Sequence, residues 1–82
     1  MLPQNNRLNK AMAERIRNAR KKQNMTQEEM TARMQTLGCD ISRGTLAKVE
    51  AGVRNVYADE LKAFRIILHI PYEVLLGEEE LS

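Results

Sequence analysis

The 82-residue sequence contains no tryptophan, one phenylalanine, two tyrosines and a single cysteine, Cys39. A lone cysteine excludes both an internal disulfide and a cysteine-rich metal site. No apolar run approaches the roughly 18 residues of a membrane-spanning helix, and residues 1–10 lack the apolar segment of a secretory signal. We therefore expect a cytoplasmic protein that does not enter a membrane and that forms one domain with a small core of aliphatic and methionine side chains.

Residues that enzymes use for covalent or acid–base chemistry are scarce. Apart from Cys39 there is one histidine, His69, and its place just before Ile70 and Pro71 suits the end of a helix better than a catalytic role. The sequence has no nucleophile–base set, no zinc-ligand spacing and no glycine-rich phosphate loop. It therefore predicts neither an enzyme nor a site for a metal or cofactor.

Charge is divided unevenly along the chain. Residues 1–54 contain eleven Lys and Arg against five Asp and Glu, a net charge of +6, whereas residues 55–82 contain two against six, a net charge of −4. The basic part favours binding to a polyanion such as nucleic acid, and the acidic part favours a different partner. An ordinary solvated surface would account for the same charges, so both interpretations stay open on this observation.

The spacing of apolar residues predicts five helices and no strand. Thr26 and Glu29 form a capping box that begins the second helix, Ser42 caps the third, and Gly38 and Gly52 end them. The expected elements are a flexible arm at residues 1–9, helices at residues 10–23, 26–37, 43–51, 58–68 and 71–76 within one all-α domain at residues 10–77, and an acidic tail at residues 78–82. The expected core comprises Met12, Ile16, Ala19, Met25, Met30, Met34, Leu37, Ile41, Leu46, Val49, Leu61, Phe64, Ile67 and Leu68.

Residues 26–52 are predicted to form a helix, a turn and a second helix. In such a pair the first helix rests on the phosphate backbone of DNA and the second enters the major groove. The outward face of the helix at residues 43–51, the later helix of the pair, carries Arg43, Gly44, Ala47 and Lys48. Arginine can donate two hydrogen bonds to a guanine, and lysine can make a similar contact through one group. The helix is therefore a candidate for reading DNA, with few polar side chains for the task.

Three segments together resemble the phage-repressor and Cro type of helix-turn-helix domain. They are MAERIRNAR at residues 12–20, MTQEEM at residues 25–30 and ISRGTLAKVEAG at residues 41–52. The resemblance covers about residues 11–77. It implies a compact five-helix bundle similar to that of the lambda repressor, in which the second helix lies across the DNA backbone and the third contacts bases.

The resemblance also implies roles for individual residues. Gln27 is expected to contact a phosphate, and Arg20 and Glu50 are expected to form an ion pair that joins the first helix to the third. The residues expected to face the bases are Arg43, Gly44, Ala47 and Lys48, with Ala47 near a thymine methyl group. Cations that flank the helix pair are expected to contact further phosphates, namely Arg54, Arg15 and Lys22.

Three features depart from the family pattern, the first being Thr31, which stands in place of the usual small Ala against the third helix. About five additional residues lie between Met34 and Ser42, which we expect to lengthen the second helix and enlarge the turn. Gly44 offers no side chain where a base contact is common, which weakens the expectation of direct readout at that position.

The sequence is thus interpreted as a sequence-specific, double-stranded DNA-binding transcription regulator. We expect a repressor that acts as a homodimer on a pseudo-palindromic operator with half-sites about 34 Å apart. The alternative is an antitoxin or a mobile-element accessory protein whose acidic C-terminal part binds a protein partner. A purely structural helical bundle is a third interpretation, and it predicts no binding to DNA.

Overall fold

The computed structural model describes residues 3–77, with side chains from residue 10 onward, and it contains five helices in that range. The helices are α1 (Pro3–Lys22), α2 (Gln27–Thr36), α3 (Arg43–Glu50), α4 (Ala58–Leu68) and α5 (Tyr72–Leu76). The predicted all-α class is therefore confirmed. Among the described residues, no helix has the length and apolar character needed to cross a membrane. The expected acidic tail lies outside the described residues.

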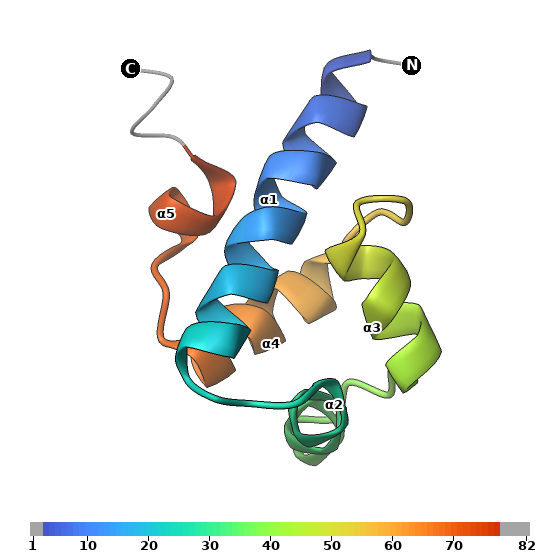
Figure 1. The fold of residues 1–82 in the computed structure, drawn as a ribbon, viewed down its shortest axis with the longest axis vertical. Coiled ribbons are helices and arrows are strands. Elements are labelled where there is room, and N and C mark those ends of the chain that lie inside the picture. The colour runs from blue at the N-terminus through green and yellow to red at the C-terminus, as the bar shows by residue number, and fades with distance from the viewer. Residues whose placement is uncertain (1–2, 78–82) are drawn as a thin grey trace.

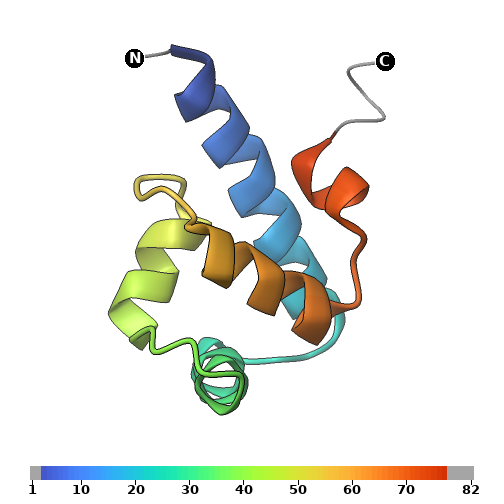
Figure 2. The ribbon, with the colours of Figure 1, turned by 180° about the vertical axis from the view of Figure 1, so that it is seen from behind.

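The long helix α1 forms the axis around which the other helices pack. In Figure 1, α3 and α5 lie on opposite sides of α1, and α2 is seen end-on below them. In the reverse view, α4 crosses α1 (Figure 2). The packed pairs are α1 with α3, α4 and α5, and α2 with α3 and α4. This arrangement leaves the outer side of α3 without a covering helix.

Side-chain caps determine where α2 and α3 begin. The Thr26 Oγ1 accepts a hydrogen bond from the Glu29 N–H at 3.0 Å, and the Glu29 Oε1 accepts one from the Thr26 N–H at 2.8 Å. Ser42 Oγ accepts a hydrogen bond from the Thr45 N–H at 3.1 Å. The predicted capping box and the predicted Ser42 cap are both confirmed.

Six of the ten helix boundaries differ from the prediction, five of them by one residue. α1 begins at Pro3 instead of at residue 10, so the backbone of residues 3–9, expected to be an arm, belongs to the first helix. Pro3 suits a first helical turn, and no glycine or further proline interrupts the chain before Lys10. Residues 1–2 of the expected arm lie outside the described residues. α5 begins at Tyr72, one position after the predicted start, because Pro71 is its N-cap.

The core draws on every helix and on both turns around α2. Its largest fully buried side chains are Phe64, Ile16, Met30, Met34, Leu46, Leu68, Leu75 and Val49. The prediction that Leu37 is buried is wrong, because α2 ends at Thr36 and Leu37, as the C-cap, is 47% exposed. After it, Gly38 has a φ of +83° and the turn directs Cys39 and Ile41 into the core. Burial raises the pKa of the Cys39 thiol, which therefore stays protonated.

Alanine at Gly52 should destabilise the fold by about 1–2 kcal/mol or more, because Gly52 adopts a left-handed conformation with a φ of +78°. A Cβ there would also lie 3.1 Å from the Lys10 Cγ and 3.3 Å from the Lys10 Cα. Gly44→Ala is the matched control, since its Cβ would meet no atom closer than Ser42 Oγ at 3.9 Å. That control should gain up to about 1 kcal/mol of helix stability. Urea denaturation followed by circular dichroism measures both, and an unchanged Gly52 variant would contradict the close packing of α1 on this turn.

Candidate nucleic-acid interface

The end of α1 and the beginnings of α2 and α3 meet at a shallow polar hollow of about 400 Å³. The first N–H groups of a helix have no partner within the helix, and here the Thr26 side chain satisfies only that of Glu29. The N-terminus of α2 therefore presents partial positive charge to this hollow, which suits an anion. The residues that line the hollow are Arg20, Thr26, Gln27, Glu28 and Arg43.

A buried ion pair supports the floor of the hollow. Arg20 Nε donates to Glu50 Oε2 at 2.7 Å, and Arg20 Nη2 donates to Glu50 Oε1 at 2.9 Å. Gln27 Nε2 donates to the same Oε1 at 3.0 Å, and Arg20 Nη1 donates to the Met25 carbonyl at 2.7 Å. Arg20 and Glu50 are 7% and 6% exposed. The network joins α1, α2 and α3 at one point and holds the Gln27 amide at the edge of the hollow.

The four residues expected to face DNA bases lie together on the uncovered side of α3. Arg43, Gly44, Ala47 and Lys48 are all exposed, whereas Leu46 is buried on the other side of the helix. Arg43 is the first residue of α3 and also borders the hollow. The helix therefore presents one cation at its beginning and another in its last turn, with two small residues between them.

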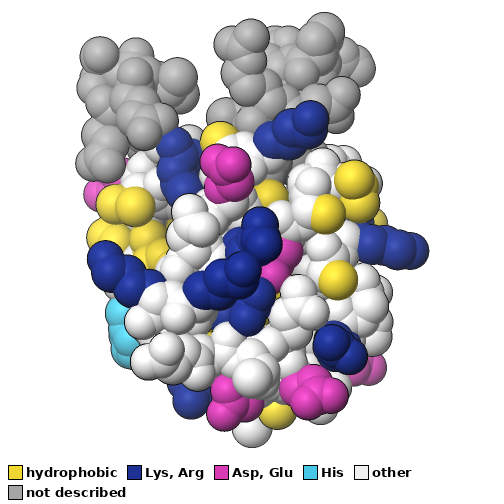
Figure 3. Space-filling model, viewed as in Figure 1, with side chains coloured by type: hydrophobic (Ala, Val, Ile, Leu, Met, Phe, Trp, Pro, Cys, Tyr) yellow, Lys and Arg dark blue, Asp and Glu magenta, His cyan; other side chains and the backbone are white. Residues whose placement is uncertain are grey.

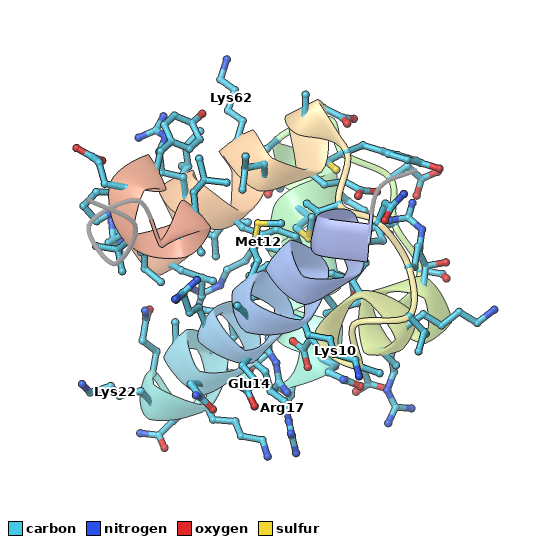
Figure 4. All side chains as sticks on the ribbon, turned by 90° about the horizontal axis from the view of Figure 1, so that it is seen from above. Lys10, Met12, Glu14, Arg17, Lys22 and Lys62 are labelled. Carbon is cyan, nitrogen blue, oxygen red and sulfur yellow. The ribbon has the colours of Figure 1, made fainter. Side chains whose placement is uncertain are left out.

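Cations continue over the neighbouring surface. On the face shown in Figure 3, Lys and Arg side chains lie over α1 and α3. Figure 4 shows Lys10, Glu14 and Arg17 on one side of α1, opposite the side from which Met12 enters the core. Lys62 projects from α4, far from these residues (Figure 4). Two cations of α1, Lys10 and Arg17, therefore lie on one side of the helix, with Glu14 as an acid between them.

Arg54, expected to contact a phosphate, is bound within the protein by another side chain. Its Nη1 donates to Glu60 Oε1 at 2.8 Å and its Nη2 donates to Glu60 Oε2 at 2.9 Å. Nη1 also donates to the Asn55 carbonyl at 2.9 Å, and the guanidinium lies 4.5 Å from the centre of the Tyr57 ring. The structure therefore gives this arginine a partner within the protein.

Two other expected phosphate contacts lie on a different side of the molecule. Arg15 and Lys22 line a groove of about 370 Å³ between α1 and α5, together with Ile70 and Val74. Arg15 Nη1 donates to the Leu75 carbonyl at 3.4 Å. Because α5 and α3 lie on opposite sides of α1 (Figure 1), these cations are not brought together with Gln27 and Arg43.

The sequence interpretation missed three residues of this region. Thr26 and Glu28 line the hollow, but the sequence pattern identified this segment only as the start of a helix. Glu60, the partner of Arg54, is 5% exposed. Its place three residues after Tyr57, where its carboxylate accepts the Tyr57 N–H at 2.9 Å, is a helix-start pattern that could have identified it. Among the described side chains, no three His, Cys, Asp or Glu residues gather into a metal site.

Comparison with known proteins gives one match. The family model described as helix-turn-helix matches residues 16–75, which contain the hollow, α3 and the Arg54–Glu60 pair. No curated protein and no solved structure matches the chain.

Removing the Glu50 carboxylate should lower the free energy of unfolding by about 3–5 kcal/mol, because Arg20 would remain buried without its counter-charge. Glu50→Ala measured by urea denaturation tests this, with Glu14→Ala on the exposed face of α1 as the control. Replacing Arg20 and Glu50 together by methionine should recover much of the loss, since no unpaired charge is then buried. A double variant no more stable than Glu50→Ala would contradict this account of the pair.

The Glu60 pair should make stability depend on pH. Burial favours a higher pKa for the Glu60 carboxyl, but hydrogen bonds from Arg54 and from the Tyr57 N–H outweigh it, so the pKa lies below its ordinary value of 4.5. The folded state therefore favours the charged form, and the resulting stabilisation is lost as the pH falls below 4.5 toward the lower folded value.

Glu60→Gln should accordingly be less stable than the wild type at neutral pH, and the difference should shrink between about pH 5 and pH 3. Thermal denaturation across this range measures the difference. The hydrogen bond from the Thr26 backbone also lowers the pKa of Glu29, but it does so in both proteins and cancels in the comparison. A difference that stays constant with pH would contradict the role assigned to Glu60.

Proposed function

The chain belongs to the helix-turn-helix family of DNA-binding transcription regulators of the phage-repressor and Cro type, and we propose that it is a repressor that binds a pseudo-palindromic operator as a homodimer. In this proposal the protein acts in the cytoplasm by occupying its operator and needs no catalytic activity or cofactor. The observation that supports it best is the uncovered face of α3 beside a polar hollow at the start of α2.

Phosphate binding is assigned to the hollow. The second amide hydrogen of Gln27 and the first N–H groups of α2 would hold a phosphate oxygen, while Glu50 keeps the Gln27 side chain in place at 3.0 Å. Arg15, Lys22 and Arg54 are omitted from the proposed contacts because two line the α5 groove and the third is paired with Glu60.

Base contacts are assigned to Arg43 and Lys48. The five-residue step between them corresponds to about 7.5 Å along a helix axis. With α3 lying along the groove, this matches about two base-pair steps of 3.4 Å each. Both side chains favour guanine, and Ala47 between them suits a thymine methyl group. Since Gly44 and Ala47 donate nothing from their side chains, DNA shape and phosphate contacts supply the remaining specificity in this proposal.

Dimerisation is assigned to the side of the molecule formed by α4 and α5. Exposed apolar side chains there are Ile66, Tyr72 and Val74, at 38%, 38% and 37% exposure. Pairing of two copies through these side chains would bury apolar area and leave both α3 helices uncovered. The two helices would then need half-sites about 34 Å apart, one turn of DNA.

Selection of bound duplexes from a random pool by the full chain tests this function. The expected product is an inverted repeat with half-sites about one helical turn apart, each containing guanines about two steps apart. On the selected duplex, Arg43→Ala and Lys48→Ala should each weaken binding by about tenfold or more. Lys62→Ala removes an exposed lysine from α4, beside the proposed dimer surface, but leaves α3 intact, so it should weaken binding much less than either α3 variant.

Each other outcome identifies an alternative. Equal affinity for all duplexes would contradict sequence-specific recognition and would favour a role that depends on a protein partner. A selected site without an inverted repeat would contradict the dimer. No binding even at about 50 mM salt, where phosphate contacts are strongest, would leave a structural bundle as the interpretation.

A further inference from the structure

The connection from α3 to α4 is held at its far end by Arg54 and Glu60. Both carboxylate oxygens of Glu60 accept hydrogen bonds from Arg54, at 2.8 and 2.9 Å. The Tyr57 N–H donates to the same carboxylate at 2.9 Å, and the Tyr57 ring covers the guanidinium at 4.5 Å. Glu60 is 5% exposed and belongs to the core helix α4. We call these three side chains, Arg54, Tyr57 and Glu60, the loop clamp.

The loop clamp is linked to the base-facing helix through the backbone. The Val53 N–H, next to Arg54 in the chain, donates to the Lys48 carbonyl at 3.1 Å, and the Gly52 N–H donates to the Val49 carbonyl at 3.0 Å. α3 packs against α1 and α2, which both pack against α4, and this loop adds the covalent connection from α3 to α4. A chain of bonds thus extends from Glu60 through Arg54 and Val53 to the turn of α3 that carries Lys48.

For Arg54 to give a phosphate the N–H groups that now bind Glu60, it would have to leave that carboxylate. The buried Glu60 carboxylate would then have no counter-charge. The free-energy cost of that state is far larger than the free energy gained from one solvent-screened phosphate contact. The hydrogen bonds to Glu60 also raise the pKa of Arg54, so the guanidinium stays charged in the pair. Retaining Glu60 is therefore the favoured state with or without DNA.

We infer that Arg54 is a positioning residue for DNA binding and does not ligate a phosphate. Bound to Glu60, it holds the loop at residues 51–56 in place. Through the hydrogen bond from Val53 to Lys48, the loop in turn sets the orientation of the end of α3. The inference rests on the proposed function for its effect on DNA. The clamping of the loop itself is independent of that function.

Affinity for the selected duplex distinguishes the two roles of Arg54. A positioning role predicts that Arg54→Gln and Glu60→Gln both weaken binding by about tenfold or more, with the salt dependence unchanged. A phosphate ligand predicts that Arg54→Gln lowers the slope of log affinity against log salt by about one, and that Glu60→Gln, which releases the cation, strengthens binding. Asp40→Asn, which removes one exposed acid from the turn between α2 and α3, is the control for the general effect of lost negative charge.

Two further measurements separate positioning from mere stabilisation of the fold. All affinities are taken at a temperature where circular dichroism shows each variant folded, and wild-type affinity in both clamp variants would overturn the inference. Arg54→Lys, which keeps the charge but cannot bridge both carboxylate oxygens, should not restore affinity if Arg54 positions the loop. Wild-type affinity in that variant would also overturn it.

Amide hydrogen exchange without DNA tests the clamp alone. The Val53 N–H should exchange at least several-fold faster in both clamp variants and at the wild-type rate in Asp40→Asn. Unchanged exchange at Val53 would overturn the inference whatever the DNA result. If the wild type binds no duplex, the proposed function and the DNA role of Arg54 fail, while faster exchange would still establish the clamp.

Discussion

The buried carboxylate of Glu50 is the constraint on which the arrangement of α1, α2 and α3 depends. It accepts three hydrogen bonds, two from Arg20 on α1 and one from Gln27 on α2. A buried carboxylate that loses these partners is strongly destabilising, so the three helices must meet where all the bonds can form. Glu50 and Val49 thereby face inward, and the opposite side of α3, with Gly44 and Lys48, is directed to solvent.

A second Arg–Glu pair has a complementary place in the structure. Arg20 and Glu50 hold the end of α3 against α1, while Arg54 and Glu60 hold the loop beyond it against α4. Two arginines of the basic segment are thus engaged within the fold. The formal charge of residues 1–54 therefore overstates the charge that can bind a polyanion, and Arg43 and Lys48 are the exposed cations of α3 itself.

Local signals predicted α2 and α3 well and predicted the outer boundaries less well. The caps made by Thr26 and Ser42 depend on residues within three positions, so they can be recognised without the fold. The start of α1 carries no such cap, and composition alone did not distinguish an arm from a helix. Leu37 was assigned to the core on spacing, but the helix ends one residue before it and the spacing no longer applies.

Sequence patterns were enough to predict the five helices, most of the core and, through three motifs, the family, but they missed the buried Ala13, Ala63 and Leu75. The sequence also determined which residues form the outward face of α3, because residue spacing along a helix sets the side on which each lies. The surroundings of the flanking cations became known from the folded structure alone: Arg15 and Lys22 lie beside α5, and Arg54 is paired with Glu60. The reason is that caps and apolar stripes are local in the chain, whereas the partner of a charge depends on which separate segments the packed core brings together.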